Sequence, residues 1–372
     1  AFFAIDLSNL ITIAEKQREL ECGTFNLLPQ SDQLKNPNWV VTSEALMHGK
    51  LLQKVATAYE GAKTVDIERF RHLFWELAEI SESSWWFHNS SPTGEGLVSG
   101  CHYVSANRTR GSIFQRNIEV YEKNGKKVVA WQCGSPCWKK MGIAVAWMNN
   151  LPASLYLGTV FDNSAAVIMP KSEEHIPAIY YFINSGEYTR EVRKINQKVQ
   201  VAAGTLDQVP FDLAHWQKLA MEKYPHGLPK PFSSDPTQWL FNGHPAGSDQ
   251  PLQVAIARLL GYQWPRQTGS NFLDCPALGS DGLEQYADND GIVCLAPLNR
   301  EQPAAHRLRA LLNAALGQFD ERDLIHKSGP KGSTKTNLEE WLRDDFFAQH
   351  CTIFQSRPFI WHLWDGLKDG FH

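Results

Sequence analysis

The sequence predicts a mixed α/β protein in which a twisted, mostly antiparallel sheet with flanking helices is followed by a mainly helical module. Between about residues 69 and 169, short apolar runs are separated by Gly, Pro and Asn, a pattern typical of strands and tight turns. From residue 172 onward, apolar residues recur at helical spacing. The 372-residue chain is 43% hydrophobic and contains 13 Trp and 19 Phe, so it can bury a large core and is not predominantly disordered.

The first part of the chain predicts one helix and then a series of strands. Thr42 and Ser43 are candidate N-caps, and Gly61 is a candidate stop for a helix between them. The expected strands are the apolar runs at 127–131, 143–147, 154–157 and 165–169.

Helices are expected over most of the remaining chain. The pattern predicts helices at 172–183 and 187–198, and a third at 213–223 that Asp212 caps. Further along, apolar residues at helical spacing predict a helix around 308–315 that ends at Gly317, and a capping-box sequence at 336–339 begins another.

We expect three parts in the chain. Residues 1–54 are an edge segment and connector, residues 55–224 form the sheet-containing domain, and residues 225–372 form the helical module. The stretch 225–251, which is rich in Pro, Gly, Ser and Asp, marks the boundary as a linker or an ordered loop. Because the chain lacks Met at position 1, we also expect it to be a segment of a longer polypeptide.

Charge is distributed unevenly, although the formal net charge is only −4. From Cys101 to Trp147 there are eight Lys or Arg and two acidic residues, whereas 272–301 contains six acidic residues and Arg300 as its one cation. This pattern excludes a uniformly basic coat but predicts that the first region faces a polyanion. No apolar run approaches the roughly 20 residues of a membrane-spanning helix, and seven scattered Cys favour reduced thiols in the cytoplasm.

The basic region also carries groups that read nucleobases. Lys and Arg provide affinity for phosphates, whereas amide and aromatic side chains on a loop can contact bases. The predicted phosphate contacts are Lys139, Lys140, Arg190 and Lys198, and the candidate base readers are Gln132, Trp138 and Asn149. The predicted nucleic-acid-binding set also includes Arg108, Arg110, Arg116 and Lys194. DNA or RNA is therefore the expected partner.

Other motifs are better explained as structure. The segment 329–336 resembles a phosphate loop but has Thr334 where that motif needs Gly, and 288–291 lacks the carboxylate spacing of a calcium loop. Cys133 and Cys137 have no second ligand pair at zinc-finger spacing. His350 and Cys351 are adjacent, so on a helix they point about 100° apart and do not form a dyad. We expect no metal site.

The segment 361–370 leaves two interpretations open. Its Trp residues with Asp365 and Asp369 would suit a carbohydrate-active site. Alternatively, they form a terminal hairpin in which Asp-Gly makes the turn, which turn chemistry favours.

Several segments together resemble one protein family. They are GSPCWKKMGIAV at 134–145, MNNLPASLYLG at 148–158, FDNSAAVIMPK at 161–171, WLFNGHP at 239–245 and RPFIWHLWDG at 357–366. This succession resembles the region after the catalytic domain in large single-chain bacterial DNA adenine-N6 methyltransferases of restriction-modification and phage-defence systems. The resemblance covers about residues 50 to 372.

The resemblance implies that the chain binds double-stranded target DNA while a neighbouring domain flips an adenine and methylates it from S-adenosylmethionine. Residues 1–54 would then be the edge of the methyltransferase domain. The family's catalytic tetrapeptide is missing, its nearest string being NPNW at 36–39, so we assign no catalytic or cofactor-binding residue to this segment. Two other hypotheses stay open, a carbohydrate-active protein and a non-catalytic scaffold that binds protein partners in a defence complex.

Overall fold

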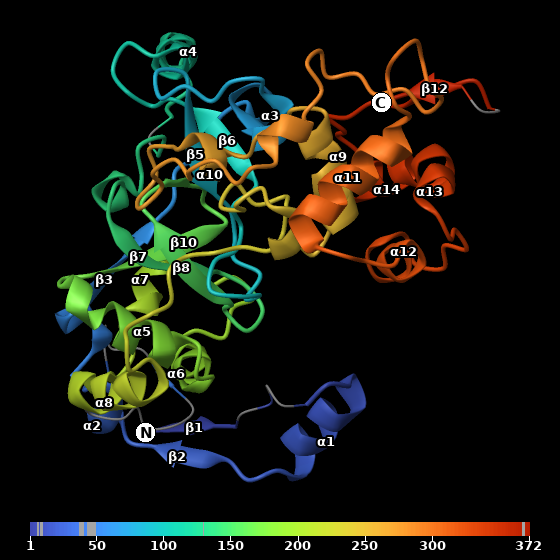
Figure 1. Cartoon of the computed structure of the whole chain (residues 1–372). Coiled ribbons are helices and arrows are strands. Elements are labelled where there is room, and N and C mark those ends of the chain that lie inside the picture. The colour runs from blue at the N-terminus through green and yellow to red at the C-terminus, as the bar shows by residue number, and fades with distance from the viewer. Residues whose placement is uncertain (6, 8–9, 37–40, 43–49, 129, 367–368) are drawn as a thin grey trace.

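The computed structural model contains two four-stranded sheets, helices around them and a helical C-terminal region (Figure 1). It describes the whole chain except residues 6, 8–9, 37–40, 43–49, 129 and 367–368. The predicted fold class, a mixed α/β protein with mostly antiparallel strands, is confirmed.

The first sheet is antiparallel throughout, in the order β3-β10-β7-β8. Its strands are β3 (Ala56–Glu60), β7 (Met141–Ala146), β8 (Ala153–Leu157) and β10 (Ala165–Pro170). β7, β8 and β10 confirm three of the expected strands. They are buried along nearly their whole length, because the sheet is covered on both faces, and this explains why their sequences are continuously apolar.

The second sheet has the order β4-β6-β5-β9. It consists of β4 (Arg71–Leu73), β5 (Trp85–Asn89), β6 (Tyr103–Ala106) and β9 (Val160–Phe161), and only the β5–β9 pair is parallel. β9 follows β8 after two residues, Gly158 and Thr159, so this short turn joins the two sheets.

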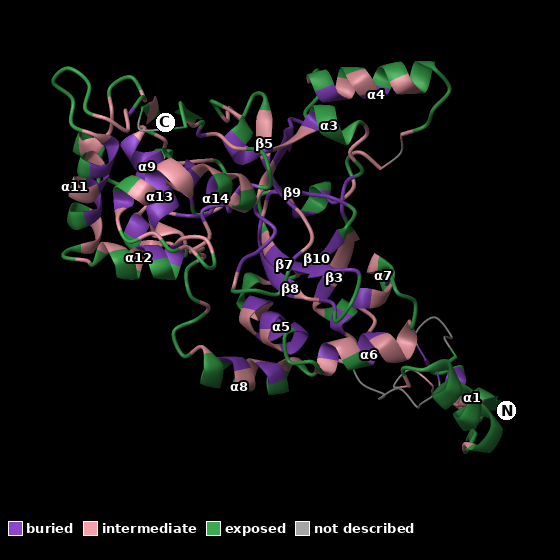
Figure 2. Ribbon diagram, turned by 90° about the vertical axis from the view of Figure 1, so that its right-hand side faces the viewer, coloured by how far each residue is buried: buried purple, intermediate pink, exposed green. Residues whose placement is uncertain are grey.

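Helices α5 (Ile176–Ile183), α6 (Glu187–Ile195), α7 (Ala203–Leu206) and α8 (Leu213–Lys223) gather around one end of the first sheet (Figures 1 and 2). As predicted, the Asp212 carboxylate caps α8 by accepting hydrogen bonds from the backbone N–H groups of Ala214 and His215. A one-turn 3-10 helix at 173–175 precedes α5.

Helix α4 (Ile113–Lys123) lies at the other end of the molecule and was not predicted. Ser112 caps it, and its buried Phe114 and Ile118 pack with Phe70 of the short helix α3 (Ile67–Phe70). The opposite face of α4 is exposed (Figure 2).

The C-terminal region is helical, as expected. It contains α9 (Pro251–Leu259), α10 (Pro265–Thr268), α11 (Ala304–Leu316), α12 (Glu321–Ser328), α13 (Leu338–Asp344) and α14 (Phe346–Ile353), followed by the hairpin β11 (Leu363–Trp364) and β12 (Gly370–Phe371). Gly317 ends α11 with a φ of 77°. Asn337 rather than Thr336 caps α13.

The N-terminal residues form a small separate unit on the outside of the fold. β1 (Phe2–Ala4) pairs with β2 (Asn26–Leu28), and α1 (Ile13–Cys22) and α2 (Gln30–Gln33) accompany them. α1 has no buried residue.

Two element predictions were wrong. The helix expected between Thr42 and Gly61 is replaced, in its described part, by a 3-10 turn at 52–54 and by β3, because β10 supplies a complete antiparallel partner. Gly61 does not end a helix but lets two backbone segments lie close together, since a Cβ at this position would lie 2.0 Å from the Asp162 carbonyl oxygen. The strand expected at 127–131 is absent from its described residues, since 127–128 have no regular structure and 130–131 lie in a turn. The carbonyls of Ala130 and Trp131 accept hydrogen bonds from individual side-chain and backbone donors rather than from a neighbouring strand.

The stretch 225–251 is an ordered loop with a buried centre. Trp239 and Phe241 are completely buried, and Trp239 packs against Phe272 with ring centroids 4.4 Å apart and planes tilted by 50°. One hydrophobic core extends from Leu52 to Ile360 and crosses this loop. The division at residue 224 stays a prediction.

Candidate functional site

The predicted basic and aromatic turn at 132–140 is held in place by two glycines. A Cβ on Gly134 (φ 79°) would lie 2.5 Å from the Phe161 ring, and a Cβ on Gly158 (φ 77°) would lie 2.8 Å from the Lys140 backbone nitrogen. Lys139 N–H donates to the Gly158 carbonyl at 2.7 Å. The turn therefore sits directly on the β8–β9 connection, as only glycine permits at these positions.

Lys139 itself adopts a left-handed conformation, with a φ of 61°. For a residue with a Cβ this conformation costs about 1–2 kcal/mol. Strain of this kind persists where the surrounding structure enforces it, and it is concentrated at functional sites. Here the contact with Gly158 enforces it and leaves the Lys139 side chain exposed.

The prediction that Arg108 contacts DNA is wrong, because this side chain is buried with 1% of its surface exposed. Its guanidinium donates to the Trp131 carbonyl at 2.7 Å and to Thr64 Oγ1 at 2.6 Å, and it lies over the Phe114 ring at 4.4 Å. Burial lowers the pKa of Arg108 to about 10, so the side chain is still a cation at neutral pH. Arg108 therefore ties α4 to the turn that follows it and does not contact solvent.

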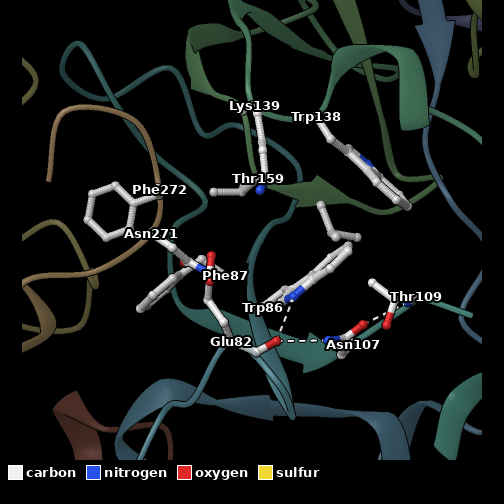
Figure 3. Close-up of a pocket in the computed structure, with 12 residues that line it drawn as sticks. Glu82, Trp86, Phe87, Asn107, Thr109, Trp138, Lys139, Thr159, Asn271 and Phe272 are labelled. Carbon is white, nitrogen blue, oxygen red and sulfur yellow. Dashed lines mark hydrogen bonds between the residues drawn. The ribbon is translucent and has the colours of Figure 1, made fainter. Parts of the chain in front are cut away.

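A pocket of about 390 Å³ lies beside the turn (Figure 3). Trp138 and Lys139 of the predicted set line it. The remaining lining residues come from segments far apart in the chain, namely Glu82, Trp86, Phe87, Asn107, Thr109, Gly158, Thr159, Val160, Asn271 and Phe272. Figure 3 shows the two indoles on one side and Asn271 with Phe272 on the opposite side.

The two tryptophans meet edge to face. The ring centroids of Trp86 and Trp138 are 5.5 Å apart and their planes make an angle of 82°. Trp86 Nε1–H donates to the Glu82 carbonyl at 3.0 Å, and Asn107 Nδ2 donates to the same carbonyl at 2.8 Å. These bonds fix one wall of the pocket (Figure 3).

Two buried polar atoms of the pocket residues lack a protein partner. Trp138 Nε1 and Thr159 Oγ1 are inaccessible and form no hydrogen bond within the described part of the chain. Native proteins satisfy nearly all such atoms. Because both atoms are inaccessible, a molecule in the pocket would not contact them, and we assign them no role in binding.

Four exposed cations from the predicted set surround this area: Arg110, Arg116, Lys139 and Lys140, which we call the cationic rim. Arg110 directly follows Thr109 of the pocket, and Arg116 lies on α4. No ion pair to a described carboxylate involves any of the four. Gln132 is exposed on the same turn. The rim is therefore free to bind an external anion.

The other predicted residues lie elsewhere, which corrects the expectation of one continuous patch. Asn149, Arg190, Lys194 and Lys198 lie at the far end of β7 and on or after α6, opposite α4 in both views (Figures 1 and 2). At about 3.3 Å per residue, β7 alone separates the two groups by roughly 17 Å. Lys194 pairs with Glu191 at 2.9 Å, and the Asn149 carbonyl accepts from Arg193 at 2.7 Å.

A buried charged cluster supports the sheet junction behind the pocket. Asp162 pairs with Arg71 at 2.8 Å and lies 3.4 Å from His88. Burial opposes ionisation of Asp162, but its contacts with His88 and Ser164 prevail and lower the pKa of the carboxyl well below its usual range. Burial lowers the pKa of His88, against the attraction of Asp162. We assign this cluster a structural role.

Sequence analysis missed most of the pocket. Trp86, Asn107, Thr159 and Asn271 belong to four separate segments, and nothing in their local spacing indicates that they meet. The one available signal was the pair of flanking glycines at Gly134 and Gly158, each of which marks a close approach.

The cysteine, histidine and terminal aspartate motifs of the sequence have structural roles. Burial raises the pKa of Cys137 to about 12, so it is an inert thiol. His350 is buried, and its ring nitrogens contact Gln253 Oε1 at 3.0 Å and the Ile360 backbone N–H at 3.2 Å. Asp365 and Asp369 close the predicted terminal hairpin, with Asp365 N–H donating to the Asp369 carbonyl at 3.0 Å.

The described residues offer neither a metal site nor a membrane-spanning helix. They contain no cluster of three or more His, Cys, Asp or Glu side chains that could hold a metal. None of the described helices combines the length and apolarity needed to cross a membrane. The string at 36–39 lies largely outside the described residues, and we assign no S-adenosylmethionine site to the described part of the chain.

Comparisons with known proteins give likenesses to solved structures, of which one is described here. No protein-family model and no curated protein matches the chain. A solved structure described as the Type IIL restriction-modification enzyme MmeI in complex with DNA is similar with a TM-score of 0.35 and 10% sequence identity. The similarity covers 50% of this chain and 31% of that one, and it is too low to define the fold.

Proposed function

We propose that this chain binds double-stranded DNA and serves as the target-recognition part of an S-adenosylmethionine-dependent adenine-N6 methyltransferase of a bacterial restriction-modification or phage-defence system. The observation that carries the DNA-binding proposal is the cationic rim. Its four cations are exposed and have no ion-pair partner among the described residues. Arg116 lies on α4, Arg110 lies in the turn before α4, and Lys139 and Lys140 end the 132–140 turn.

The rim would hold DNA through its phosphates. Lys139 and Lys140 end the turn, and Arg110 and Arg116 extend the positive charge onto α4. Phosphate contacts position the duplex but carry no sequence information. Gln132 is exposed on the same turn, and its amide could read a base edge.

The methylation chemistry is proposed for another part of a longer polypeptide. It rests on the resemblance of segments such as 134–145 and 161–171 to the methyltransferase family. S-adenosylmethionine would bind there, with the flipped adenine. The rim and its turn would keep the duplex in register during that step.

Duplex binding measured across a salt series tests the proposal. Each phosphate contact to B-DNA contributes about 0.9 to the slope of log affinity against log salt concentration. We expect Lys139→Ala/Lys140→Ala to lower the slope by about 1.8 and to weaken all sequences alike.

A charge-matched variant provides the control. Arg190→Ala/Lys198→Ala removes two exposed cations from the opposite end of the molecule, so we expect it to leave the slope unchanged. Equal effects of the two double variants, or no salt-dependent duplex binding at all, would reject the rim as the DNA site.

A further inference from the structure

Helix α4 carries an exposed polar face on the side away from the core. Its inward face contains Phe114 and Ile118, which pack with Phe70 and against Trp131. The opposite face, which we call the outer face of α4, consists of four exposed residues at i, i+3, i+4 and i+7 spacing, namely Arg116, Glu119, Val120 and Lys123. Figure 2 shows α4 at the margin of the molecule, so this face is accessible to a partner.

The surface around α4 is positively charged. From Arg110 to Lys127 there are five exposed cations against two acidic residues, Glu119 and Glu122, a net charge of +3. None of the five cations forms an ion pair with a described carboxylate. A surface of this kind is complementary to a polyanion.

The dimensions of α4 fit one groove of B-form DNA. The helix has 11 residues, so it is about 16 Å long and, with its side chains, about 10–12 Å across. The major groove of B-DNA is about 12 Å wide and admits a helix, whereas the minor groove is only about 6 Å wide. Double-stranded RNA has a deep, narrow major groove that side chains cannot read. The geometry therefore favours the major groove of DNA.

Packing holds α4 against the segment that leads into the 132–140 turn. The Arg108 guanidinium lies over the Phe114 ring at 4.4 Å and donates to the Trp131 carbonyl at 2.7 Å. The Phe114 and Trp131 ring centroids are 6.1 Å apart. A duplex held by Lys139 and Lys140 at the end of this turn would therefore meet α4 as a fixed element.

The acidic residue of the outer face favours contact with bases over contact with phosphates alone. The Glu119 carboxylate accepts a hydrogen bond from Gln115 Nε2 at 3.0 Å, which orients it on the helix. A carboxylate repels phosphates but accepts hydrogen bonds from the amino group of cytosine. The neighbouring Val120 offers an apolar contact for a thymine methyl group, and Lys123 offers a donor for guanine.

We propose that α4 lies in the major groove of B-form DNA and reads bases with Glu119, Val120 and Lys123, while the cationic rim holds the neighbouring phosphates. This proposal rests on the proposed DNA-binding function and names the element that selects the sequence. Glu119 and Lys123 are one helical turn apart, with about 5–6 Å between their Cβ atoms. Because base pairs are stacked about 3.4 Å apart, the two side chains should read base pairs one or two steps apart.

Selection from a randomised duplex library tests the proposal, followed by anisotropy titrations of the selected duplex and its single-base-pair variants. We expect Glu119→Ala to reduce the preference at one base pair by at least about fivefold. The same variant should bind a random-sequence duplex as tightly as the wild type or more tightly, because a charge that repels phosphates is removed. Lys123→Ala should relax the preference one or two base pairs away.

Glu222→Ala is the matched control. Glu222 is also an exposed helical glutamate, but it lies on α8, at the opposite end of the molecule from α4 (Figures 1 and 2). The charge change is identical, so we expect no loss of base preference. Both variants replace an exposed helical residue by alanine, a strong helix former, and should melt at the wild-type temperature.

The outcomes separate this proposal from the proposed function. Absence of salt-dependent binding to any duplex would reject DNA binding itself. Salt-dependent binding without a base preference, or with a preference that Glu119→Ala and Lys123→Ala leave unchanged, would reject only the role of α4. Equal affinity for an RNA duplex of the selected sequence would overturn the placement of α4 in the major groove.

Discussion

Arg108 gives the sharpest test of how this surface is built. The sequence predicts a DNA-binding residue, whereas the structure buries the guanidinium beneath the turn. The two roles differ in what a substitution changes. Arg108→Ala should destabilise the fold if the residue is structural, and it should alter only DNA binding if the residue contacts phosphate.

The structure sets the size of the effect. Arg108 makes two short charge-assisted hydrogen bonds, to the Trp131 carbonyl at 2.7 Å and to Thr64 Oγ1 at 2.6 Å. Such bonds contribute about 1.5–3 kcal/mol each, and stacking on Phe114 at 4.4 Å adds to them. The cost of burying the cation offsets part of this gain. We expect Arg108→Ala to lower the free energy of unfolding by about 3 kcal/mol.

Urea unfolding and a salt series of duplex binding together measure this prediction. Arg108→Lys should destabilise almost as much as Arg108→Ala, because an ammonium cannot reproduce the guanidinium fork. The neighbouring Arg110 is exposed and provides the control. Arg110→Ala should change the unfolding free energy by less than about 0.5 kcal/mol and lower the salt slope by about 0.9. If Arg108→Ala behaved like Arg110→Ala in both assays, the structural role would be refuted.

Three further predictions concern backbone strain, close packing and pH. Lys139→Gly should raise the free energy of unfolding by about 0.5–1 kcal/mol by relieving the left-handed strain, whereas Lys139→Ala should not, and both should weaken duplex binding equally in anisotropy titrations. Gly158→Ala should cost about 2–4 kcal/mol in urea melts, because its Cβ would lie 2.8 Å from the Lys140 nitrogen; a wild-type midpoint would contradict the close packing. Burial lowers the pKa of His350 and His372 to about 3, so both stay neutral in the fold while the unfolded chain binds protons below about pH 6.5. Stability should therefore be complete above that pH and fall by up to about 1.4 kcal/mol per pH unit for each histidine as the pH drops toward 3, and a stability curve flat from pH 7 to pH 5 would disprove this burial.

The sequence predicted the elements whose information is local. Asp212 caps α8 and Gly317 ends α11, because a cap or a left-handed stop depends on a few neighbouring residues. β7, β8 and β10 were found for the same reason, since continuous apolar runs bounded by turn residues mark buried strands. The basic, aromatic turn at 132–140 was also recognised as the candidate site.

Where a segment's partner is distant in sequence, local patterns failed. β3 has moderate helical character, but pairing with β10 more than a hundred residues away makes it a strand. Arg190 and Lys198 were grouped with Lys139 because all are cations near the same sheet. A strand's length separates them in space.

By itself, the sequence determined the fold class, the capped helices, the buried strands and the charge of the turn, since each depends on spacing and residue type within a short window. Only the tertiary structure decided that Arg108 is buried while Lys139 is exposed, and that Trp86, Trp138 and Thr159 line one pocket. The physical reason is that burial and convergence depend on which distant segments pack together, and a charge or an indole has the same local pattern in either environment.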